Sequence, residues 1–178
     1  MNDRFNDKAL DTVLISESHS SAFFKTKCYG YTVNQEGEMT VYEPEARIVR
    51  WIYKSFLSGN SRSLIQKQLQ EAGIPSPSGK KNWCYRSILN ILTNEKYYGA
   101  VCVYKSYLGD QYSGTQPENS KGQELVWWLD HHEPIISKED FLAAQEEKKR
   151  RCNYEIDESG NRHRKATRYH STNALVEM

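Results

Sequence analysis

The segment 74–79, Ile-Pro-Ser-Pro-Ser-Gly, limits the possible folds of this chain of 178 residues more than any other stretch. Two prolines and a glycine this close together exclude a helix there. The apolar patterns on either side of the segment must therefore belong to separate, short helices. A chain of this length suits one domain of ordinary size, or a smaller domain with long surface segments.

Two helices are predicted before this break. The first begins at Pro44, because proline fits the first turn of a helix, and it ends at 58–60, where a serine, a glycine and an asparagine follow one another. The second begins after Ser61, a suitable N-cap, and ends at Gly73, where a C-terminal glycine is expected. Apolar residues at spacings of three and four give each helix one inward face.

Two further helices are predicted after the break. The third follows Trp83 and places Ile88, Leu89 and Leu92 on its inner face. Trp83 is interpreted as a core anchor of this helix, and so is Tyr97. The last helix follows Ser137 and runs to residue 151. Ser137 has Asp140 three residues later, which resembles a capping box.

Short strands complete the prediction. Residues 29–33 and 39–42 are rich in β-forming residues and flank a turn with Asn and Gly, which is typical of a hairpin. Residues 100–104 and 124–129 predict two strands that pair across a polar loop. We therefore expect an α+β fold, with a small helix-turn-helix-like core, a short hairpin, a small antiparallel sheet and a closing C-terminal helix.

The charge of the chain is distributed unevenly. The 24 basic and 23 acidic side chains give a net charge of only +1. Residues 44–110, however, hold 10 basic and 4 acidic residues, a balance of +6, between acidic flanks. A basic block of this kind indicates a polyanionic partner, although charged residues also form the ordinary solvated face of a helix.

A complete catalytic or metal site is not found in the sequence. The motifs G-x-S-x-G, H-E-x-x-H and G-x-x-x-x-G-K are absent, and the four cysteines form no C-x-x-C pair. His131 and His132 are adjacent, and on a strand they would point to opposite faces rather than toward one metal ion. We therefore expect no catalytic residue, no metal and no cofactor in this chain.

The second and third helices fit the requirements of a DNA-binding pair. The third helix is expected to enter a DNA groove, with Arg86 pairing with guanine O6 and N7 and Asn90 with adenine N6 and N7. The surrounding cations would contact phosphates and carry no sequence information. The residues expected to contact double-stranded DNA are Arg62, Lys67, Lys80, Lys81, Asn82, Tyr85, Arg86, Asn90 and Lys96.

An ordered series of motifs resembles the DNA-binding recombinase domain of large serine recombinases, enzymes that integrate and excise phages and mobile elements. The resemblance covers about residues 29–151. Its motifs are YGYTVN at 29–34, PEARIVRWIYKSFLSG at 44–59, SLIQKQLQEAGIP at 63–75, Trp83, ILTN at 91–94, YYG at 97–99 and HEPII at 132–136 with Phe141, Ala144 and Gln145.

The resemblance also implies how the chain is organised. Members of this family carry an N-terminal catalytic domain with a serine in a Y-x-R-x-S context, and that motif is absent here. We therefore expect residues 1–28 to be a linker or tail, 29–151 the DNA-binding domain, and 152–178 a charged connector toward a zinc ribbon. On this reading the chain is not itself an enzyme, and it binds double-stranded DNA at an attachment site as part of a serine site-specific recombinase.

Other functions are compatible with parts of the sequence. The main alternative is a stand-alone helix-turn-helix regulator or excision cofactor derived from such a domain. A nuclease or tyrosine recombinase is disfavoured, because the His-x-x-Arg expected near a catalytic tyrosine is missing. A role of Trp127 and Trp128 in protein–protein contact is a secondary possibility. The chain has no apolar run long enough for a membrane span, and we expect no membrane partner. We expect a cytoplasmic, nucleoid-associated protein of bacterial or phage origin. Self-association is expected only in the full-length protein.

Overall fold

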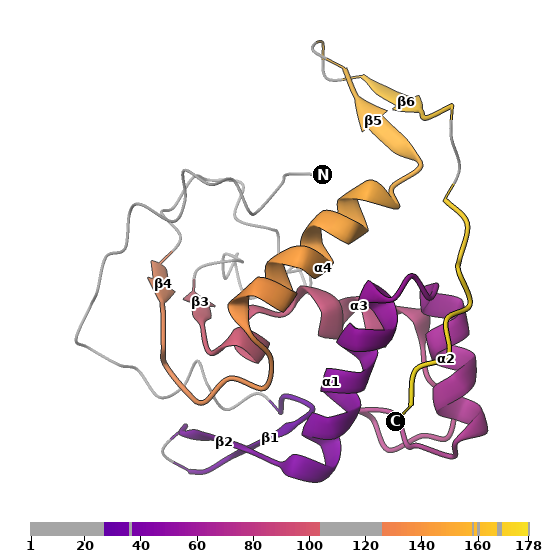
Figure 1. Ribbon diagram of the computed structural model, residues 1–178. Coiled ribbons are helices and arrows are strands. Elements are labelled where there is room, and N and C mark those ends of the chain that lie inside the picture. The colour runs from indigo at the N-terminus through magenta and orange to yellow at the C-terminus, as the bar shows by residue number, and fades with distance from the viewer. Residues whose placement is uncertain are drawn as a thin grey trace, which may run out of the picture.

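The computed structural model describes residues 27–35, 37–103, 126–157, 159, 161–166 and 169–177 (Figure 1). Residues 1–26 of the predicted tail (1–28) and the predicted polar loop at 108–123 lie outside these residues. Along the chain, the elements are β1 (Tyr31–Val33), β2 (Met39–Val41), α1 (Glu43–Leu57), α2 (Arg62–Glu71), α3 (Tyr85–Thr93), the 3-10 helix η3 (Glu95–Tyr98), β3 (Val101–Val103), β4 (Val126–Trp128), α4 (Lys138–Arg150), β5 (Tyr154–Ile156) and β6 (Arg162–Arg164). The predicted α+β class is confirmed.

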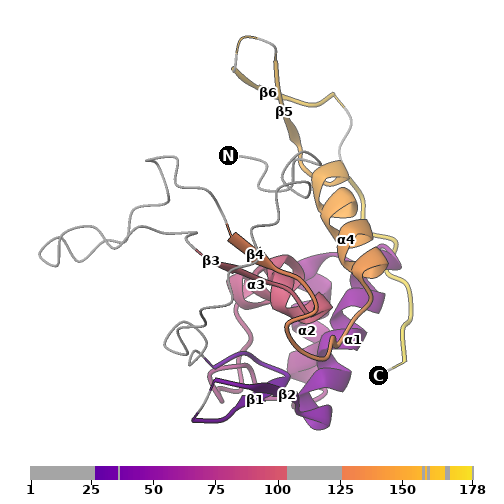
Figure 2. The ribbon, with the colours of Figure 1, turned by 90° about the vertical axis from the view of Figure 1, so that its left-hand side faces the viewer.

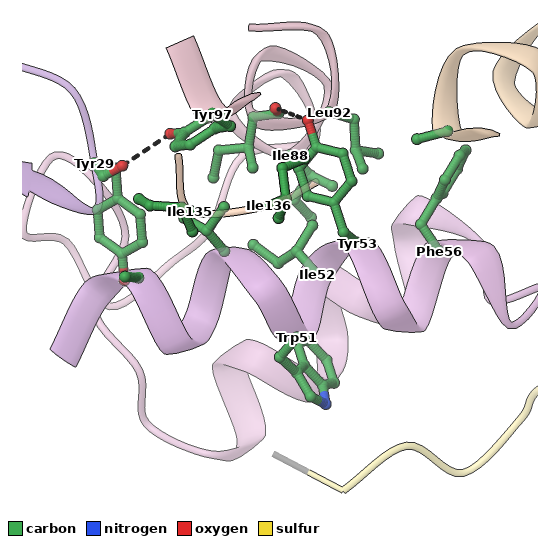
Figure 3. Packing of buried hydrophobic residues seen from close by; sticks show 14 of the residues in the cluster. Tyr29, Trp51, Ile52, Tyr53, Phe56, Ile88, Leu92, Tyr97, Ile135 and Ile136 are labelled. Carbon is green, nitrogen blue, oxygen red and sulfur yellow. Dashed lines mark hydrogen bonds between the residues drawn. The ribbon is translucent and has the colours of Figure 1, made fainter. Parts of the chain in front are cut away.

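Helix α1 is the centre of the core and is buried on more than one side. Ile52, Tyr53 and Phe56 lie on the side of α3 and α4, whereas Trp51 points away from them toward the C-terminal segment (Figure 3). The Tyr53 hydroxyl donates to the Ile91 carbonyl (2.9 Å) and so ties α1 to α3. The sequence predicted one inward face for this helix, but Trp51 and Tyr53, which point in different directions, are both almost fully buried, at 4% and 2% exposure.

The predicted boundaries of α2 are confirmed by its caps. The backbone N–H of Leu64 donates to the Ser61 hydroxyl (3.2 Å), as expected of an N-cap serine. Gly73 follows the C-cap with φ of +68°, a left-handed conformation that glycine adopts without steric cost. The connection from α2 to α3 contains no helix, as segment 74–79 predicted.

Trp83 holds the connection between α2 and α3 against the core. Its ring is 2% exposed, its Nε1 donates to the Ile74 carbonyl (2.9 Å), and its own carbonyl accepts from Gln66 Nε2 on α2 (2.8 Å). Tyr29 packs edge-on against the same ring. The prediction that Trp83 is a core anchor is confirmed, and the start of α3 is fixed relative to α2.

The inner face of α3 differs from the predicted one by one residue. Ile88, Ile91 and Leu92 are buried, whereas Leu89 is only half-buried. Residues 88, 91 and 92 stand at spacings of three and four, the helical period, and both α2 and α4 pack against α3. The prediction that Leu89 lies on this face was therefore wrong.

Two short antiparallel sheets flank the helices as predicted. Strands β1 and β2 pair with Thr32 opposite Thr40, and β3 and β4 pair with Cys102 opposite Trp127. The β1–β2 hairpin is fixed to α1, because the Gly30 N–H donates to a carboxylate oxygen of Glu45 in the first turn of α1 (2.8 Å). Tyr97, predicted as a core anchor, is 2% exposed and donates its hydroxyl proton to the Tyr29 carbonyl (Figure 3).

Helix α4 closes the core. Its N-terminus is capped as predicted, since the Asp140 N–H donates to the Ser137 hydroxyl (3.0 Å). Phe141 is fully buried, and Gln145 donates to the Leu92 carbonyl at the end of α3 (2.6 Å). No helix in the described part of the chain is long and apolar enough to cross a membrane.

The region after α4 contains ordered structure within the stretch predicted to be a connector. Strands β5 and β6 form a hairpin that projects beyond the end of α4 in both ribbon views (Figures 1 and 2). Residues 169–177 then run back along α1 and the α1–α2 turn. Trp51 Nε1 donates to the Val176 carbonyl (3.0 Å), and Asn60 Nδ2 donates to the Ala174 carbonyl (2.8 Å).

Candidate nucleic-acid interface

The N-termini of α2 and α3 meet at a cation–π contact. The guanidinium carbon of Arg62 lies 4.2 Å from the ring centroid of Tyr85, the first residue of α3. Partial burial lowers the pKa of Arg62 from its ordinary value, but arginine begins so far above neutrality that the side chain remains charged. Two of the predicted DNA-contacting residues are therefore brought together, and the positive charge of Arg62 is held at the start of α3.

The outer face of α3 is polar and exposed. Tyr85 is 44% exposed, and Arg86 and Asn90 are also exposed, on the side opposite Ile88. Arg86 and Asn90 are four residues apart, so they lie one above the other, separated along the axis by about 6 Å. This arrangement presents a guanidinium and an amide side by side to whatever contacts the helix.

The basic turn that precedes α3 is exposed but not loose. Lys80, Lys81 and Asn82 are all exposed. The turn is closed by backbone hydrogen bonds, from the Ser76 N–H to the Lys80 carbonyl (2.9 Å) and from the Gly79 N–H to the Ser76 carbonyl (2.7 Å). Buried Trp83 anchors its other end. The two lysines consequently lie in a closed turn that leads into α3.

The remaining two predicted cations lie elsewhere. Lys67 is exposed on α2 and forms an ion pair with Glu71 (3.7 Å), an exposed contact of the kind that contributes little stability. Lys96 belongs to η3, beyond the C-terminal end of α3, and is half-buried. Its carbonyl accepts from the Tyr31 hydroxyl (3.2 Å). The structure therefore places Arg62, Tyr85 and Arg86 at the start of α3, and Lys80, Lys81 and Asn82 in the turn that leads into it. Asn90 lies further along α3, and Lys96 lies beyond its opposite end.

A histidine pair beside η3 corrects one sequence expectation. His131 and His132 follow β4 rather than lying within it, so they do not point to opposite faces as they would on a strand. Their Nδ1 atoms lie 3.1 Å apart. His132 Nε2 lies 2.6 Å from the Lys96 carbonyl, so it must carry a proton and donate. Burial lowers the pKa of His132. Among the residues that the structure describes, no group of three or more His, Cys, Asp or Glu side chains is placed to hold a metal ion.

Arg151 is a basic residue whose position the sequence did not reveal. Its side chain is 9% exposed, and its guanidinium lies between the rings of Phe56 (4.0 Å) and Tyr169 (4.4 Å). It donates to the carbonyls of Phe56 and Asn60 (both 2.6 Å) and pairs with Glu147. The run of charges at 146–151 was visible in the sequence, but these contacts join residues more than ninety positions apart.

These features define an α+β domain in which the N-termini of two helices meet and the second of these helices carries an exposed polar face. Residues 43–151, which include helices α1, α2, α3 and α4, match the Recombinase family. The match covers more than half of the chain, and the chain therefore belongs to the Recombinase family.

Two solved structures are similar to the chain. One is a large serine recombinase in complex with DNA, with 28% sequence identity and a TM-score of 0.52, covering 74% of this chain and 34% of that chain. The other comes from work on the sequence requirements of the Listeria innocua prophage attP site, with 25% identity and a TM-score of 0.49, covering 78% of this chain and 62% of that chain. The chain thus spans about a third of the length of the first protein.

Proposed function

We propose that this chain binds double-stranded DNA as the DNA-binding part of a serine site-specific recombinase and holds that recombinase on its attachment site. The observation that carries the proposal is the Arg62–Tyr85 contact, which sets the exposed Arg86–Asn90 face of α3 beside fixed positive charge. Membership of the Recombinase family supports it, as does similarity to a large serine recombinase bound to DNA. The catalytic serine would be supplied by another part of the recombinase.

The dimensions of α3 suit the major groove of DNA. An α-helix with its side chains is about 10–12 Å across, and the groove is about 12 Å wide. With α3 in the groove, Arg86 would donate two hydrogen bonds to a guanine and Asn90 would pair with an adenine. Lys80, Lys81 and Arg62, at the start of the helix, would contact the phosphates that border the groove.

Salt dependence of binding tests this proposal. Contact with roughly four phosphates predicts a slope of log affinity against log salt concentration near −3.6 on any duplex. A slope near zero on every duplex, attachment-site DNA included, would overturn the proposal.

Two single variants separate base reading from phosphate contact. Arg86→Ala should reduce the preference for attachment-site DNA over mixed-sequence DNA, by roughly 1–3 kcal/mol for one bidentate contact. Lys81→Ala should weaken binding to both duplexes equally and make the salt slope shallower by about 0.9. Both side chains are exposed, so neither change should affect folding. If Arg86→Ala, like Lys81→Ala, weakened binding to both duplexes equally, the role assigned to α3 would be contradicted.

A further inference from the structure

The β5–β6 hairpin carries two arginine side chains on one of its faces. Tyr154 of β5 lies opposite Arg164 of β6, and Arg162, two residues from Arg164, falls on the same face. Both guanidinium groups lie over the Tyr154 ring, with their carbon atoms 4.0 Å (Arg162) and 5.8 Å (Arg164) from its centroid. Every residue of β6 is exposed.

The two acidic side chains of the hairpin that the structure describes, Glu155 and Asp157, lie away from this face. Glu155 pairs with His163 in the register, on the opposite side of the two-stranded ribbon. Asp157 lies at the turn, where it accepts from His163 Nε2 (2.6 Å) and from the Asn161 N–H (2.7 Å). Among the described residues, no ion pair engages Arg162 or Arg164. The two guanidinium groups are thus held by an aromatic ring and remain available to an external anion.

The base of the hairpin is anchored on both sides. The Lys165 N–H donates to the Asn153 carbonyl (2.8 Å), which closes the base. On the side of α4, Arg151 donates to the Asn60 carbonyl (2.6 Å). On the other side, the Tyr169 hydroxyl donates to the Gly59 carbonyl. Both ends of the hairpin therefore converge on the turn between α1 and α2.

This anchoring places the hairpin on the side of the molecule where α2 begins. Ser61, directly after Asn60, is the N-cap of α2, and its N–H donates to the Ser171 hydroxyl (3.1 Å). Arg62 follows, and the nearby charge of Arg151 contributes to lowering the pKa of Arg62. The hairpin root, the N-terminus of α2 and the N-terminus of α3 thus form a continuous series of neighbouring elements.

We propose that the Tyr154–Arg162–Arg164 face of the hairpin binds the sugar–phosphate backbone of the same DNA duplex that α3 contacts, beyond the N-terminus of α2. The inference rests on the proposed function. Arginine is suited to this role, because its planar guanidinium donates two parallel hydrogen bonds to a phosphate. Stacking on Tyr154 restricts both side chains before DNA arrives, which reduces the entropy lost on binding.

The test compares the double variant R162A/R164A with a control that removes the same charge elsewhere. Lys54→Ala with Lys138→Ala is a matched control, since both lysines are exposed and lie at the end of α1 and the start of α4. Affinity for a mixed-sequence duplex of about three helical turns is measured across a salt series. Loss of two phosphate contacts should make the slope of R162A/R164A shallower by about 1.8. Its affinity deficit relative to the wild type should therefore shrink about 12-fold between about 50 and 200 mM salt.

A charge-preserving variant distinguishes lost contacts from a disrupted hairpin. Arg162→Lys with Arg164→Lys should keep a slope close to that of the wild type, and the control should change it far less than R162A/R164A does. An unchanged slope in R162A/R164A, while the wild type binds DNA with a steep slope, would overturn the inference and leave the proposed function standing. A slope of the same reduced size in the lysine control would also overturn it, because net charge alone would then explain the effect. Failure of the wild type to bind any duplex would overturn both proposals.

Discussion

Arg151 is expected to stabilise the domain far more than its neighbour Arg150, although both pair with Glu147. The Arg150 side chain is 64% exposed and that of Arg151 is 9% exposed. Arg151 also donates to two carbonyl oxygens and lies between two aromatic rings. Hydrogen bonds from charged groups contribute about 1.5–3 kcal/mol each, and removing one partner from a buried ion pair costs about 3–5 kcal/mol. Because Glu147 keeps Arg150 as a partner, we expect the lower end of these values.

The expected loss for Arg151→Ala is therefore about 3 kcal/mol in the free energy of unfolding. For a chain of this size, that corresponds to a melting temperature lowered by about 6–12 °C. Urea denaturation followed by circular dichroism measures the loss, with Arg150→Ala as the matched control, for which the denaturation midpoint should hardly move. Equal midpoints for the two variants would refute the reasoning that burial and the carbonyl contacts, rather than the pairing with Glu147, give Arg151 its importance.

Three further predictions concern stability. Burial lowers the pKa of His132, so the folded state binds fewer protons than the unfolded state at mildly acidic pH. The free energy of unfolding should therefore fall as the pH drops below about 6.5. The urea midpoint should show this loss in the wild type and less of it in His132→Gln. Gln145→Ala leaves the buried Leu92 carbonyl without its donor and should cost about 1–3 kcal/mol in the same assay, whereas exposed Glu146→Ala should cost far less. Ser61→Ala removes the N-cap of α2 and should cost about 1 kcal/mol, with restoration by Ser61→Asp; no recovery with aspartate would contradict a capping role.

Features set by neighbouring residues could be predicted from the sequence. The caps at Ser61 and Ser137 and the left-handed Gly73 depend on contacts within four residues, so their residue types reveal them directly. The exposed positions of Arg86 and Asn90 followed from the same helical period that placed Ile88 inside. The burial of α1 on several sides did not follow, because the partner of Trp51 is a carbonyl 125 residues later in the chain.

The positions of His131, His132 and Arg151 could not be predicted from the sequence, because they depend on how distant parts of the chain come together. A strand predicted to end at residue 129 gives no information about how the chain turns afterwards, and that turn brings the rings of His131 and His132 together. Arg151 belonged to a run of charges that resembles any solvated helix end. Its burial depends on Phe56 of α1 and on Tyr169, and Tyr169 follows a hairpin that the sequence did not suggest.

The charge of the hairpin also shows the limit of counting charges by segment. Residues 111–178 are acidic in sum, yet Arg162 and Arg164 share one face and Glu155 lies on the other. Counterion release depends on the number of phosphates contacted and not on the net charge of the protein. Glu155→Gln should therefore leave the salt slope of DNA binding unchanged, although it makes the chain more basic by one unit. The salt slope of Glu155→Gln could instead become steeper by about 0.9, the amount that one phosphate contact adds. That result would mean that the whole hairpin acts as a diffuse charge and that its two faces are not distinct.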